Sequence, residues 1–342
     1  MRLLLSALAA LAGLVGSLAA PLPASAQQAP IPVRIGVIPV IGAAPIFVAR
    51  GEGWLKEAGL EPTFTTFESG PNMIQALASG TIDIYVAGVA PLAVARTKGI
   101  DVRVVAATAI EEMVFVAGPK LAPYFASAPS KADAFKAFKA KEGRAARLAT
   151  QPAGSVPNTT LQHWLWQVAK ADKADAEVVP MGIDATQQAV LAGAMDGASI
   201  REPALTIVQT RNPAIKLIAT GGEMFPNQPG TVVAVYGKFA DKNPAAVDAL
   251  VKALVKSTDL LKTDPAKAAP HVEQALGKGI TDVATIQKAI SSPAAKFVAD
   301  PRTIIEATKA LQTYQVSIGT LDKEAPTDGL FDAKPYEKAV KP

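Results

Sequence analysis

Residues Val33 to Gly99 decide the fold, and they read VRIGVIPVIGAAPIFVARGEGWLKEAGLEPTFTTFESGPNMIQALASGTIDIYVAGVAPLAVARTKG. One pattern occurs three times in this stretch: an apolar run, a short loop and a helical pattern that ends at a glycine. The apolar runs are Val33–Val40, Pro62–Phe67 and Ile82–Ala87. Three strand–loop–helix units in succession predict an α/β fold with a parallel sheet.

Proline and glycine mark the two ends of each expected helix. A proline is tolerated at the first helical position because its missing N–H would have no partner there. A glycine just beyond the last turn accepts the left-handed conformation in which the final carbonyls are paired. The prolines are Pro45, Pro71 and Pro91, and the glycines are Gly59, Gly80 and Gly99.

The loops between each strand and its helix are the first candidates for binding residues. In parallel α/β sheets, small ligands lie beyond the carboxyl ends of the strands and against helix N-termini. The candidates from the three loops are Ile41, Gly42 and Ala43, then Glu68, Ser69 and Gly70, and then Gly88, Val89 and Ala90.

The second half of the chain repeats this design. Leu77–Asp83 and Val190–Asp196 share their apolar character and the spacing of a glycine and an aspartate, and a helix-start proline follows each of them. Two lobes of one design are the simplest account, and the punctuation common to all α/β units is the alternative. Met113–Ala117 and Thr231–Tyr236 are the candidate strands that cross between the lobes.

The expected order of segments follows from these patterns. We expect a leader over residues 1–26, the first part of lobe 1 over 32–114 and lobe 2 over 115–220. A return to lobe 1 with C-terminal helices follows over 221–320, and a loosely attached polar tail over 321–342. Asp184 and Gln187 have the spacing of a capping box at the start of a helix in lobe 2.

The first 26 residues predict export. Arg2 is followed by the apolar run Leu3–Ala20, and Ala24-Ser25-Ala26 is a small-residue cleavage site, so we expect cleavage after Ala26 and a periplasmic or secreted protein. A membrane anchor is the alternative interpretation of this run. The chain has no cysteine, which excludes disulfides and a lipid attached through cysteine.

Composition and motifs argue against a nucleic-acid-binding protein and against an enzyme. The formal charge of +4 is mild, and the basic stretch Lys131–Arg147 is interrupted by acidic residues, which is typical of a solvated helix face. The two histidines, His163 and His271, lie in expected helices and have no metal-site spacing around them. The chain has no nucleotide fingerprint and no nucleophile elbow. We therefore expect no cofactor, no metal and no catalysis.

Two motifs of the second half are further candidates. Gly154-Ser155, followed by Val156, opens a helix, and its hydroxyl and free N–H groups would attract an anionic or polar group. Simple capping by Ser155 is equally consistent. Arg201 could fork onto a carboxylate or sulfonate, whereas Glu202 could pair with Arg201 or cap its own helix.

Carboxylates also stand at predicted strand ends. Glu68, Glu111 and Glu112 all occupy such positions. Their number is unusual for a purely anion-binding site, and a zwitterionic or amine-bearing ligand would account for both signs of charge. Solvated loop charges are the alternative.

Together these motifs resemble the nitrate/sulfonate/taurine class of ABC-transporter substrate-binding proteins, over about Val33 to Leu260. In the first half the resemblance rests on Gly36–Pro39, Pro45–Arg50, Gly53–Leu60, Phe67–Pro71, Ala76–Asp83 and Gly88–Pro91. In the second half, Gly154-Ser155 and Arg201-Glu202-Pro203 fall where that family has a Gly-Ser helix start and a Trp-Asp/Glu-Pro motif.

The resemblance implies the type II periplasmic-binding-protein fold, with two Rossmann-like lobes joined by two crossing strands and a ligand enclosed by hinge motion. It also implies that the loops at Ile41–Ala43, Glu68–Gly70, Gly88–Ala90, Gly154–Val156 and Arg201–Glu202 line the pocket. The chain departs from the family at Arg201, where Trp is usual, and at Val156-Pro157-Asn158. These departures weigh against nitrate and simple sulfonates as ligands.

The function expected from residues and resemblance is solute capture for an ABC importer. The solute would be a small polar or anionic one of the sulfonate, taurine, nitrate or carboxylate class, with Glu112 among the pocket residues. We expect a monomer that delivers this ligand to a permease and its ATPase. The alternatives are a ligand that is a pyrimidine, a thiamine precursor or an amine, or an exported enzyme on the same scaffold. The related pyrimidine-synthesis enzymes depend on a Cys-rich motif, which this chain lacks.

Overall fold

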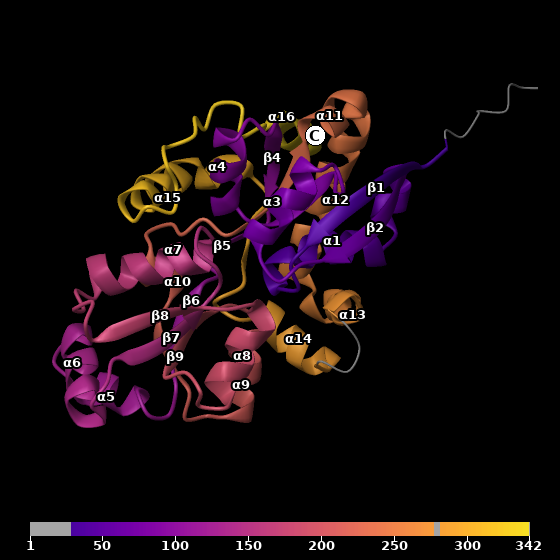
Figure 1. Cartoon of the computed structure of the whole chain (residues 1–342). Coiled ribbons are helices and arrows are strands. Elements are labelled where there is room, and N and C mark those ends of the chain that lie inside the picture. Colours follow the sequence, from indigo (N-terminus) through magenta and orange to yellow (C-terminus); the bar gives the residue numbers. More distant parts are fainter. Residues whose placement is uncertain (1–28, 277–280, 342) are drawn as a thin grey trace, which may run out of the picture.

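A computed structural model of the chain describes residues 29–276 and 281–341, so the expected leader and its cleavage site after Ala26 lie outside the described residues. The chain forms two α/β lobes, each built on a five-stranded sheet, and the lobes lie one above the other in Figure 1. The expected fold class is confirmed. Among the described helices, none is long and apolar enough to cross a membrane.

The first lobe is built on a sheet with the strand order β2-β1-β3-β11-β4. β1, β2 and β3 are parallel, as the opening stretch predicts, whereas β11 inserts antiparallel between β3 and β4. The strands span β1 Ile31–Val37, β2 Leu60–Thr66, β3 Ile84–Gly88, β4 Val102–Ala107 and β11 Thr231–Tyr236.

The helices of the first lobe begin and end as proline and glycine predict. Each proline stands within the first two helical positions, and Gly59, Gly80 and Gly99 have φ of 71°, 69° and 78°. The first helix is divided at Gly53, whose φ is 82°. The helical elements are the 3₁₀ turn η1 Ile41–Ala43, α1 Ala44–Gly51, α2 Trp54–Glu57, α3 Gly70–Ala78 and α4 Ala90–Thr97.

The second lobe repeats the topology of the first. Its sheet has the order β10-β6-β9-β7-β8, with β7 parallel to β8 and β9, and β6 antiparallel to β9 and β10. Its elements are β6 Val114–Ala117, α5 Ala122–Ser127, α6 Lys131–Glu142, β7 Ala146–Thr150, α7 Val156–His163, the π-helical turn η2 Trp164–Val168, β8 Ala176–Pro180, α8 Ile183–Leu191, β9 Gly197–Ile200, α9 Ala204–Arg211, β10 Lys216–Ala219 and α10 Gly221–Met224.

The repeated aspartate has the same contacts in both lobes. Asp83 accepts a hydrogen bond from the backbone N–H of Arg34 at 2.9 Å and donates its own N–H to the Arg34 carbonyl at 2.7 Å. Asp196 makes the equivalent pair of bonds with Arg147, both at 2.8 Å. The aspartate thus fixes β3 beside β1 in the first lobe and β9 beside β7 in the second, which is why the motif occurs twice.

The crossings between the lobes differ from the prediction. β6 and β11 lie entirely within the two sheets, so Met113–Ala117 and Thr231–Tyr236 are not themselves the crossings. The chain crosses just before each of them, at residues 108–113 and 225–230. These segments run side by side, since the N–H of Glu111 donates to the Gln228 carbonyl at 2.9 Å and the buried Gln228 amide accepts from the Met113 N–H at 2.8 Å.

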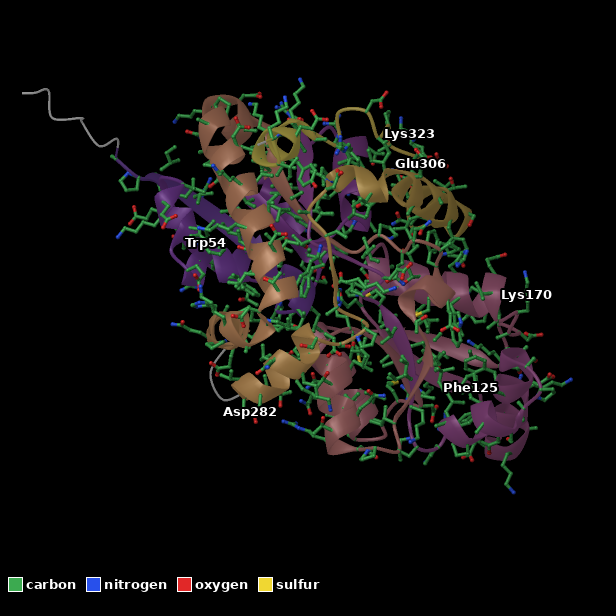
Figure 2. The ribbon with its side chains drawn as sticks, turned by 180° about the vertical axis from the view of Figure 1, so that it is seen from behind. Trp54, Phe125, Lys170, Asp282, Glu306 and Lys323 are labelled. Atoms are coloured by element: carbon green, nitrogen blue, oxygen red, sulfur yellow. The ribbon has the colours of Figure 1, made fainter. Side chains whose placement is uncertain are left out.

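The C-terminal helices mostly cover the first lobe. Trp54, on the edge of that lobe in Figure 2, packs partly buried against its core, and the ammonium of Lys256 lies 4.0 Å from the centre of its ring. The remaining elements are β5 Ala109–Ile110, α11 Gly237–Lys242, α12 Pro244–Thr263, α13 Pro265–Leu276, α14 Val283–Ile290, β12 Lys296–Phe297, the 3₁₀ turn η3 Pro301–Ile304, α15 Ile305–Ser317 and α16 Lys334–Ala339.

Two smaller expectations are wrong. Residues Asp322–Pro342 are not a loose tail over their described part, because Ala325 and Leu330 are buried and α16 packs against α12. The expected capping box at Asp184 and Gln187 is absent, since α8 begins after Gly182 and no side chain caps it.

Candidate functional site

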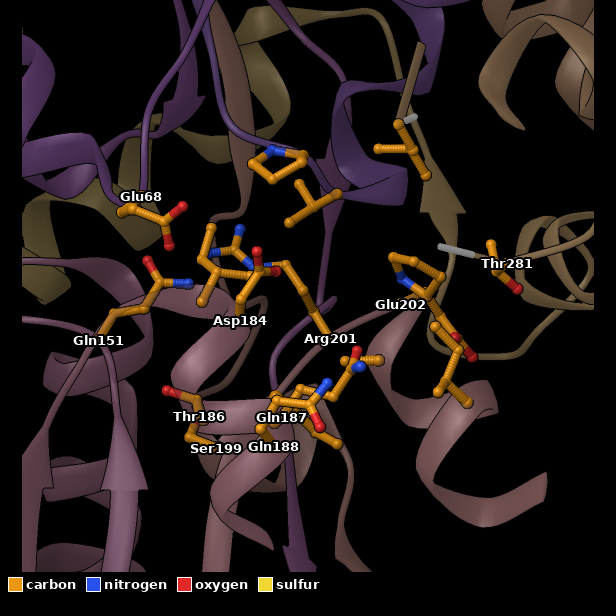
Figure 3. Close-up of a pocket in the computed structure, with 18 of the residues that line it drawn as sticks. Glu68, Gln151, Asp184, Thr186, Gln187, Gln188, Ser199, Arg201, Glu202 and Thr281 are labelled. Atoms are coloured by element: carbon orange, nitrogen blue, oxygen red, sulfur yellow. The ribbon is translucent and has the colours of Figure 1, made fainter. Parts of the chain in front are cut away.

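A cavity of about 400 Å³ lies between the two lobes (Figure 3). The first lobe contributes the ends of β1 and β2, and the second lobe contributes the ends of β7 and β9 together with residues of α8 and α9. Its polar and charged lining residues are Thr66, Glu68, Gln151, Asp184, Thr186, Gln187, Gln188, Ser199, Arg201, Glu202, Arg211 and Thr281. The carboxyl ends of parallel strands thus face each other across the cleft, as expected for a ligand site in this architecture.

Several predicted residues line a second, much smaller space between the lobes, which we call the inner space, and we call the 400 Å³ cavity the outer space. Gly70, Gly88, Ser155, Val156 and Arg201 surround only about 10 Å³. The walls meet closely here, since a Cβ added to Gly88 would lie 2.8 Å from the Cγ2 of Val156 in the opposite lobe. The two lobes therefore approach each other closely at these predicted loops, and only Glu68, Arg201 and Glu202 of the predicted set line the larger cavity.

The remaining predicted residues line neither space. Ile41, Gly42 and Ala43 form η1 and are buried, and the N–H of Ile41 donates across the lobes to the Glu202 carbonyl at 3.0 Å. Ser69, Val89 and Ala90 are also buried. The Gly154 carbonyl accepts a hydrogen bond from the Gln315 amide of α15 at 3.4 Å. These groups shape the closed cleft and leave little surface for a solute.

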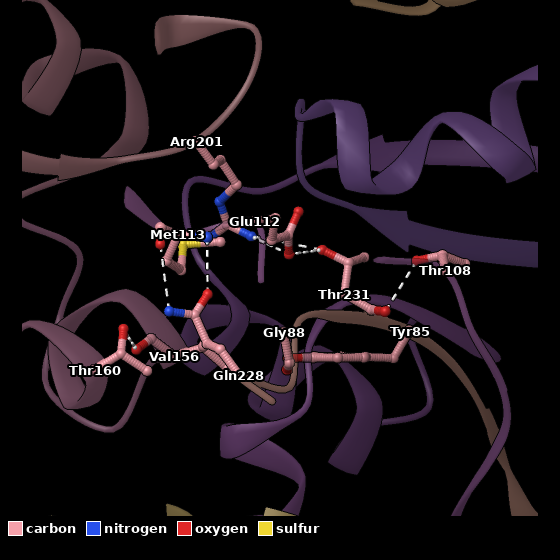
Figure 4. Close-up of polar contacts among 10 residues, drawn as sticks. All are labelled: Tyr85, Gly88, Thr108, Glu112, Met113, Val156, Thr160, Arg201, Gln228 and Thr231. Carbon is pink, nitrogen blue, oxygen red and sulfur yellow. Dashed lines mark hydrogen bonds and ion pairs between the residues drawn. The ribbon is translucent and has the colours of Figure 1, made fainter. Parts of the chain in front are cut away.

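Arg201 and Glu112 form a buried ion pair at the crossing between the lobes (Figure 4). Arg201 Nη1 lies 3.1 Å from Glu112 Oε1, and the hydroxyl of Thr231 donates to the same oxygen at 2.6 Å. Arg201 is 4 % exposed and Glu112 is 2 % exposed. Burial lowers the pKa of the Arg201 guanidinium, and the ion pair with Glu112 opposes that shift. Glu112 is therefore a counter-ion of Arg201 in this structure.

Several buried polar atoms around the cleft have no hydrogen-bond partner among the described residues. They include Nε of Arg201 and the hydroxyl oxygens of Ser69, Thr150 and Ser199. Most buried polar groups in proteins are paired, so an unpaired one beside a cavity is a candidate partner for a ligand or a water molecule. Arg201 and Ser199 also line the 400 Å³ cavity.

Ser155 has the role of a helix cap. Its hydroxyl accepts a hydrogen bond from the N–H of Asn158 at 3.3 Å, and Pro157 in the same turn has no N–H. The start of α7 is thus largely satisfied by the chain itself. The capping alternative considered for Ser155 accounts for its contacts.

Glu202 caps its own helix and makes no ion pair with Arg201. Its carboxylate accepts hydrogen bonds from the N–H of Thr206 at 3.0 Å and from the Thr206 hydroxyl at 2.9 Å. Burial raises the pKa of the Glu202 carboxyl, although hydrogen bonds from Ser292 and Thr206 and the charge of Lys288 act in the opposite direction.

Sequence reasoning missed most residues of the larger cavity. The first turn of α8 follows β8, so the rule that selects the other strand–helix loops also applies to it, whereas the spacing of Asp184 and Gln187 predicts a capping box. Ser199 lies within β9, and Arg211 ends α9, so neither stands in a strand–helix loop.

The described part of the chain has no metal centre that competes with this cleft as a functional site. Among residues 29–276 and 281–341, no group of His, Cys, Asp and Glu could hold a metal ion. The imidazole of His163 lies 2.9 Å from the Met224 carbonyl, and His271 lies 2.9 Å from the carboxylate of Glu52. Both histidines contact groups of the protein outside the 400 Å³ cavity.

Comparison with known proteins points to one group of proteins. The model of the NMT1-like family matches residues 26–276. The chain is 22% identical over 319 residues to a putative aliphatic sulfonates-binding protein of Bacillus subtilis, covering 90% of this chain and 88% of that protein. It is 23% identical over 258 residues to a putative binding protein of Brucella suis, covering 71% of each.

Solved structures with the same two-lobed fold are also found. The nitrate-binding protein of Synechocystis has a TM-score of 0.75 at 15% identity and covers 91% of this chain and 88% of its own. The alkanesulfonate-binding protein of Xanthomonas axonopodis, bound to MOPS, has a TM-score of 0.70 at 20% identity and covers 89% and 99%. At these identities the likeness shows the fold alone.

Proposed function

The chain belongs to the NMT1-like family, and from that premise we propose that it is the solute-binding component of an ABC importer. The names of its relatives support the proposal: one is described as an aliphatic sulfonates-binding protein, and the solved structures include binding proteins for nitrate and alkanesulfonate. We propose capture and release of a solute without chemical change, so the chain is not an enzyme.

The observation that carries this proposal is the cavity shared by the two lobes. Its walls come from both sheets, and the lobes are joined by paired crossing segments at one side. A solute held in such a cavity contacts both lobes only when they are close together. Its binding therefore favours the closed arrangement by its differential affinity for that state.

The solute we propose is a small polar or anionic molecule of the sulfonate, taurine, nitrate or carboxylate class. The unpaired Nε–H of Arg201 and the Ser199 hydroxyl are suitable donors for a sulfonate or carboxylate oxygen. The Gln151 amide lines both the inner and the outer space and can contribute a further hydrogen bond.

The proposal extends to location and partners. We propose that residues 1–26 direct export, that the mature chain acts as a periplasmic monomer, and that it passes its solute to a permease and the ATPase of that permease. The names of the structural neighbours, which are periplasmic nitrate- and sulphonate-binding proteins, support this assignment.

A ligand screen by thermal unfolding tests the proposal. The panel contains nitrate, bicarbonate, alkane- and arylsulfonates, taurine, aromatic carboxylates and aminopyrimidines. A solute at about 100 times its dissociation constant adds about 2.7 kcal/mol to the free energy of unfolding. We expect a hit that also reduces the radius of gyration in solution scattering. A hit that leaves the radius unchanged, or that is converted to a product, would contradict the proposal.

A further inference from the structure

The charges around the 400 Å³ cavity do not form a simple anion site. Three carboxylates line it, from Glu68, Asp184 and Glu202, together with the guanidinium groups of Arg201 and Arg211. Arg201 already has Glu112 as its counter-ion. A small inorganic anion would therefore enter a cavity in which negative groups outnumber the uncompensated positive ones, and entry would be opposed by Coulomb repulsion.

One of these carboxylates, Glu68, reaches across the cleft to the start of the helix that carries another, Asp184. Glu68 extends from the first lobe toward the second (Figure 3), and its Oε2 would lie 2.9 Å from a Cβ added to Gly182, the residue before α8. Asp184 belongs to the first turn of that same helix. Closing the lobes thus brings Glu68 to the turn that carries Asp184. A positively charged ligand group between them would remove repulsion that otherwise opposes closure.

Donors for an anionic group line the same cavity. Nε of Arg201 and the hydroxyl of Ser199 are buried without a partner among the described residues, and their residues are 4 % and 2 % exposed. Such donors gain most from an ionised acceptor, because hydrogen bonds to charged groups are stronger than neutral ones. The residues around the cavity therefore include both carboxylates and buried donors without a partner.

The size and walls of the cavity indicate what separates the two charged groups. A volume of about 400 Å³ is large beside the roughly 30 Å³ that one water occupies in the liquid. Its apolar lining includes Val40, Ile183, Ile207 and Leu276. Apolar walls between polar groups suit a hydrocarbon segment, because burying that segment is favourable.

We propose that the cleft selects an elongated zwitterionic solute. Its ammonium group binds between Glu68 and Asp184, and its carboxylate or sulfonate group binds at Arg201 Nε and Ser199. An aliphatic chain lies along the apolar wall. This inference rests on the proposed solute-binding function and names the ligand class for the same cavity. It follows that inorganic anions and simple alkanesulfonates bind weakly.

Matched ligand pairs test the inference by titration calorimetry. The probes are ε-aminocaproate against caproate and taurine against ethanesulfonate, with nitrate as the inorganic anion. We expect ε-aminocaproate to bind at least about tenfold more tightly than caproate, because one charge-assisted contact is worth about 1.5–3 kcal/mol. We also expect ε-aminocaproate to bind more tightly than taurine, because its longer hydrocarbon segment buries more apolar surface against Val40, Ile183, Ile207 and Leu276.

Variants locate the ammonium group. Glu68→Gln and Asp184→Asn should each reduce the ratio of the two affinities, for ε-aminocaproate and caproate, by about three- to tenfold. Glu61→Gln, on an exposed part of β2 outside the cavity, is the matched control and should leave the ratio unchanged. A ratio near one in the unaltered protein, or one that neither variant changes, would overturn the inference. If neither pair binds, the inference is wrong, whereas a hit elsewhere in the solute screen would still uphold the proposed function.

Discussion

The inner and outer parts of the cleft are built by the same two lobes but differ in what they leave open. The inner part encloses about 10 Å³ between loops that sequence reasoning selected, whereas the outer part encloses about 400 Å³ between residues that it mostly missed. Gly88 lets the inner walls approach closely, and the buried ion pair of Arg201 and Glu112 joins the second lobe to a crossing segment beside them. The comparison suggests that the inner part sets the closed geometry and the outer part binds the solute.

Arg201→Ala tests the buried ion pair with Glu112 and should have the largest effect on stability. The substitution leaves the Glu112 carboxylate buried without its counter-ion, which typically costs about 3–5 kcal/mol of stability. Urea unfolding of the purified protein measures this loss. Adding Glu112→Gln should restore most of the lost stability, because burying a neutral amide costs less free energy than burying an unpaired carboxylate. A loss below about 1 kcal/mol in the single variant would show that the ion pair contributes little to the stability of the fold.

Gly88→Ala tests the close approach of the inner walls. The new Cβ would lie 2.8 Å from the Cγ2 of Val156, and overpacking of this kind costs about 1–3 kcal/mol. We expect the lobes to separate, which solution scattering detects as a larger radius of gyration. Val156→Ala in the same chain should restore the original radius. An unchanged radius of gyration in Gly88→Ala would mean that the contact between residue 88 and Val156 adjusts without separating the lobes.

Ser155→Ala separates a structural role from a binding role. Loss of a helix cap costs about 1 kcal/mol, and we expect that drop in the free energy of unfolding with no change in ligand affinity. Ser130→Ala is the matched control, because Ser130 caps α6 by accepting a hydrogen bond from the Asp133 N–H at 3.1 Å, outside the cleft. Weaker ligand binding in Ser155→Ala alone would place Ser155 in the binding site.

Glu202→Gln should have the smallest effect, and the effect should depend on pH. Burial raises the pKa of the Glu202 carboxyl, so the unfolded chain loses this proton first as the pH rises above about 4.3. The stability contributed by the protonated group is therefore present at low pH and is lost as the pH rises through the folded-state pKa. We expect the variant to lack this loss when its unfolding is compared with the unaltered protein at pH 4 and pH 7.

The outcome for Glu202 bears directly on the comparison of the two parts of the cleft. Glu202 is buried at the cavity wall, beside Thr206, Ser292 and Lys288. If the pH dependence of the two proteins is the same, Glu202 is ionised and its charge belongs in the inventory of the outer cavity. If the difference is found, the outer cavity is less negative at low pH than its residues suggest.

Local patterns in the sequence predicted the architecture well. The predicted prolines stand within the first two positions of first-lobe helices, and the predicted glycines, which have positive φ, follow the helix ends. The two Asp-containing motifs make the same backbone contacts in both lobes. These features depend on residues close in the chain or repeated within it. Their physical causes, such as the missing proline N–H, act without help from distant segments.

The site was predicted less well because its contacts join distant segments. Glu112 and Arg201 each stood out by position, but their pairing joins residues 89 positions apart in the chain. The capping box expected at Asp184 is absent because α8 begins after Gly182, which places Asp184 inside the first turn of the helix. Gly182 itself lies close to the Glu68 side chain of the other lobe. Similarly, the crossings lie before β6 and β11, since those apolar strands complete the two sheets.

By itself the sequence determined the two-lobed α/β fold, the repeated units and the strand ends at which a ligand site would form. These follow from periodicity, helix ends and strand-forming runs, which are short-range properties. Only the tertiary structure decided which strand-end residues close the cleft and which leave a cavity. That distinction depends on how closely two walls approach and on which charges neutralise each other there, and both are set by the packing of segments far apart in the chain.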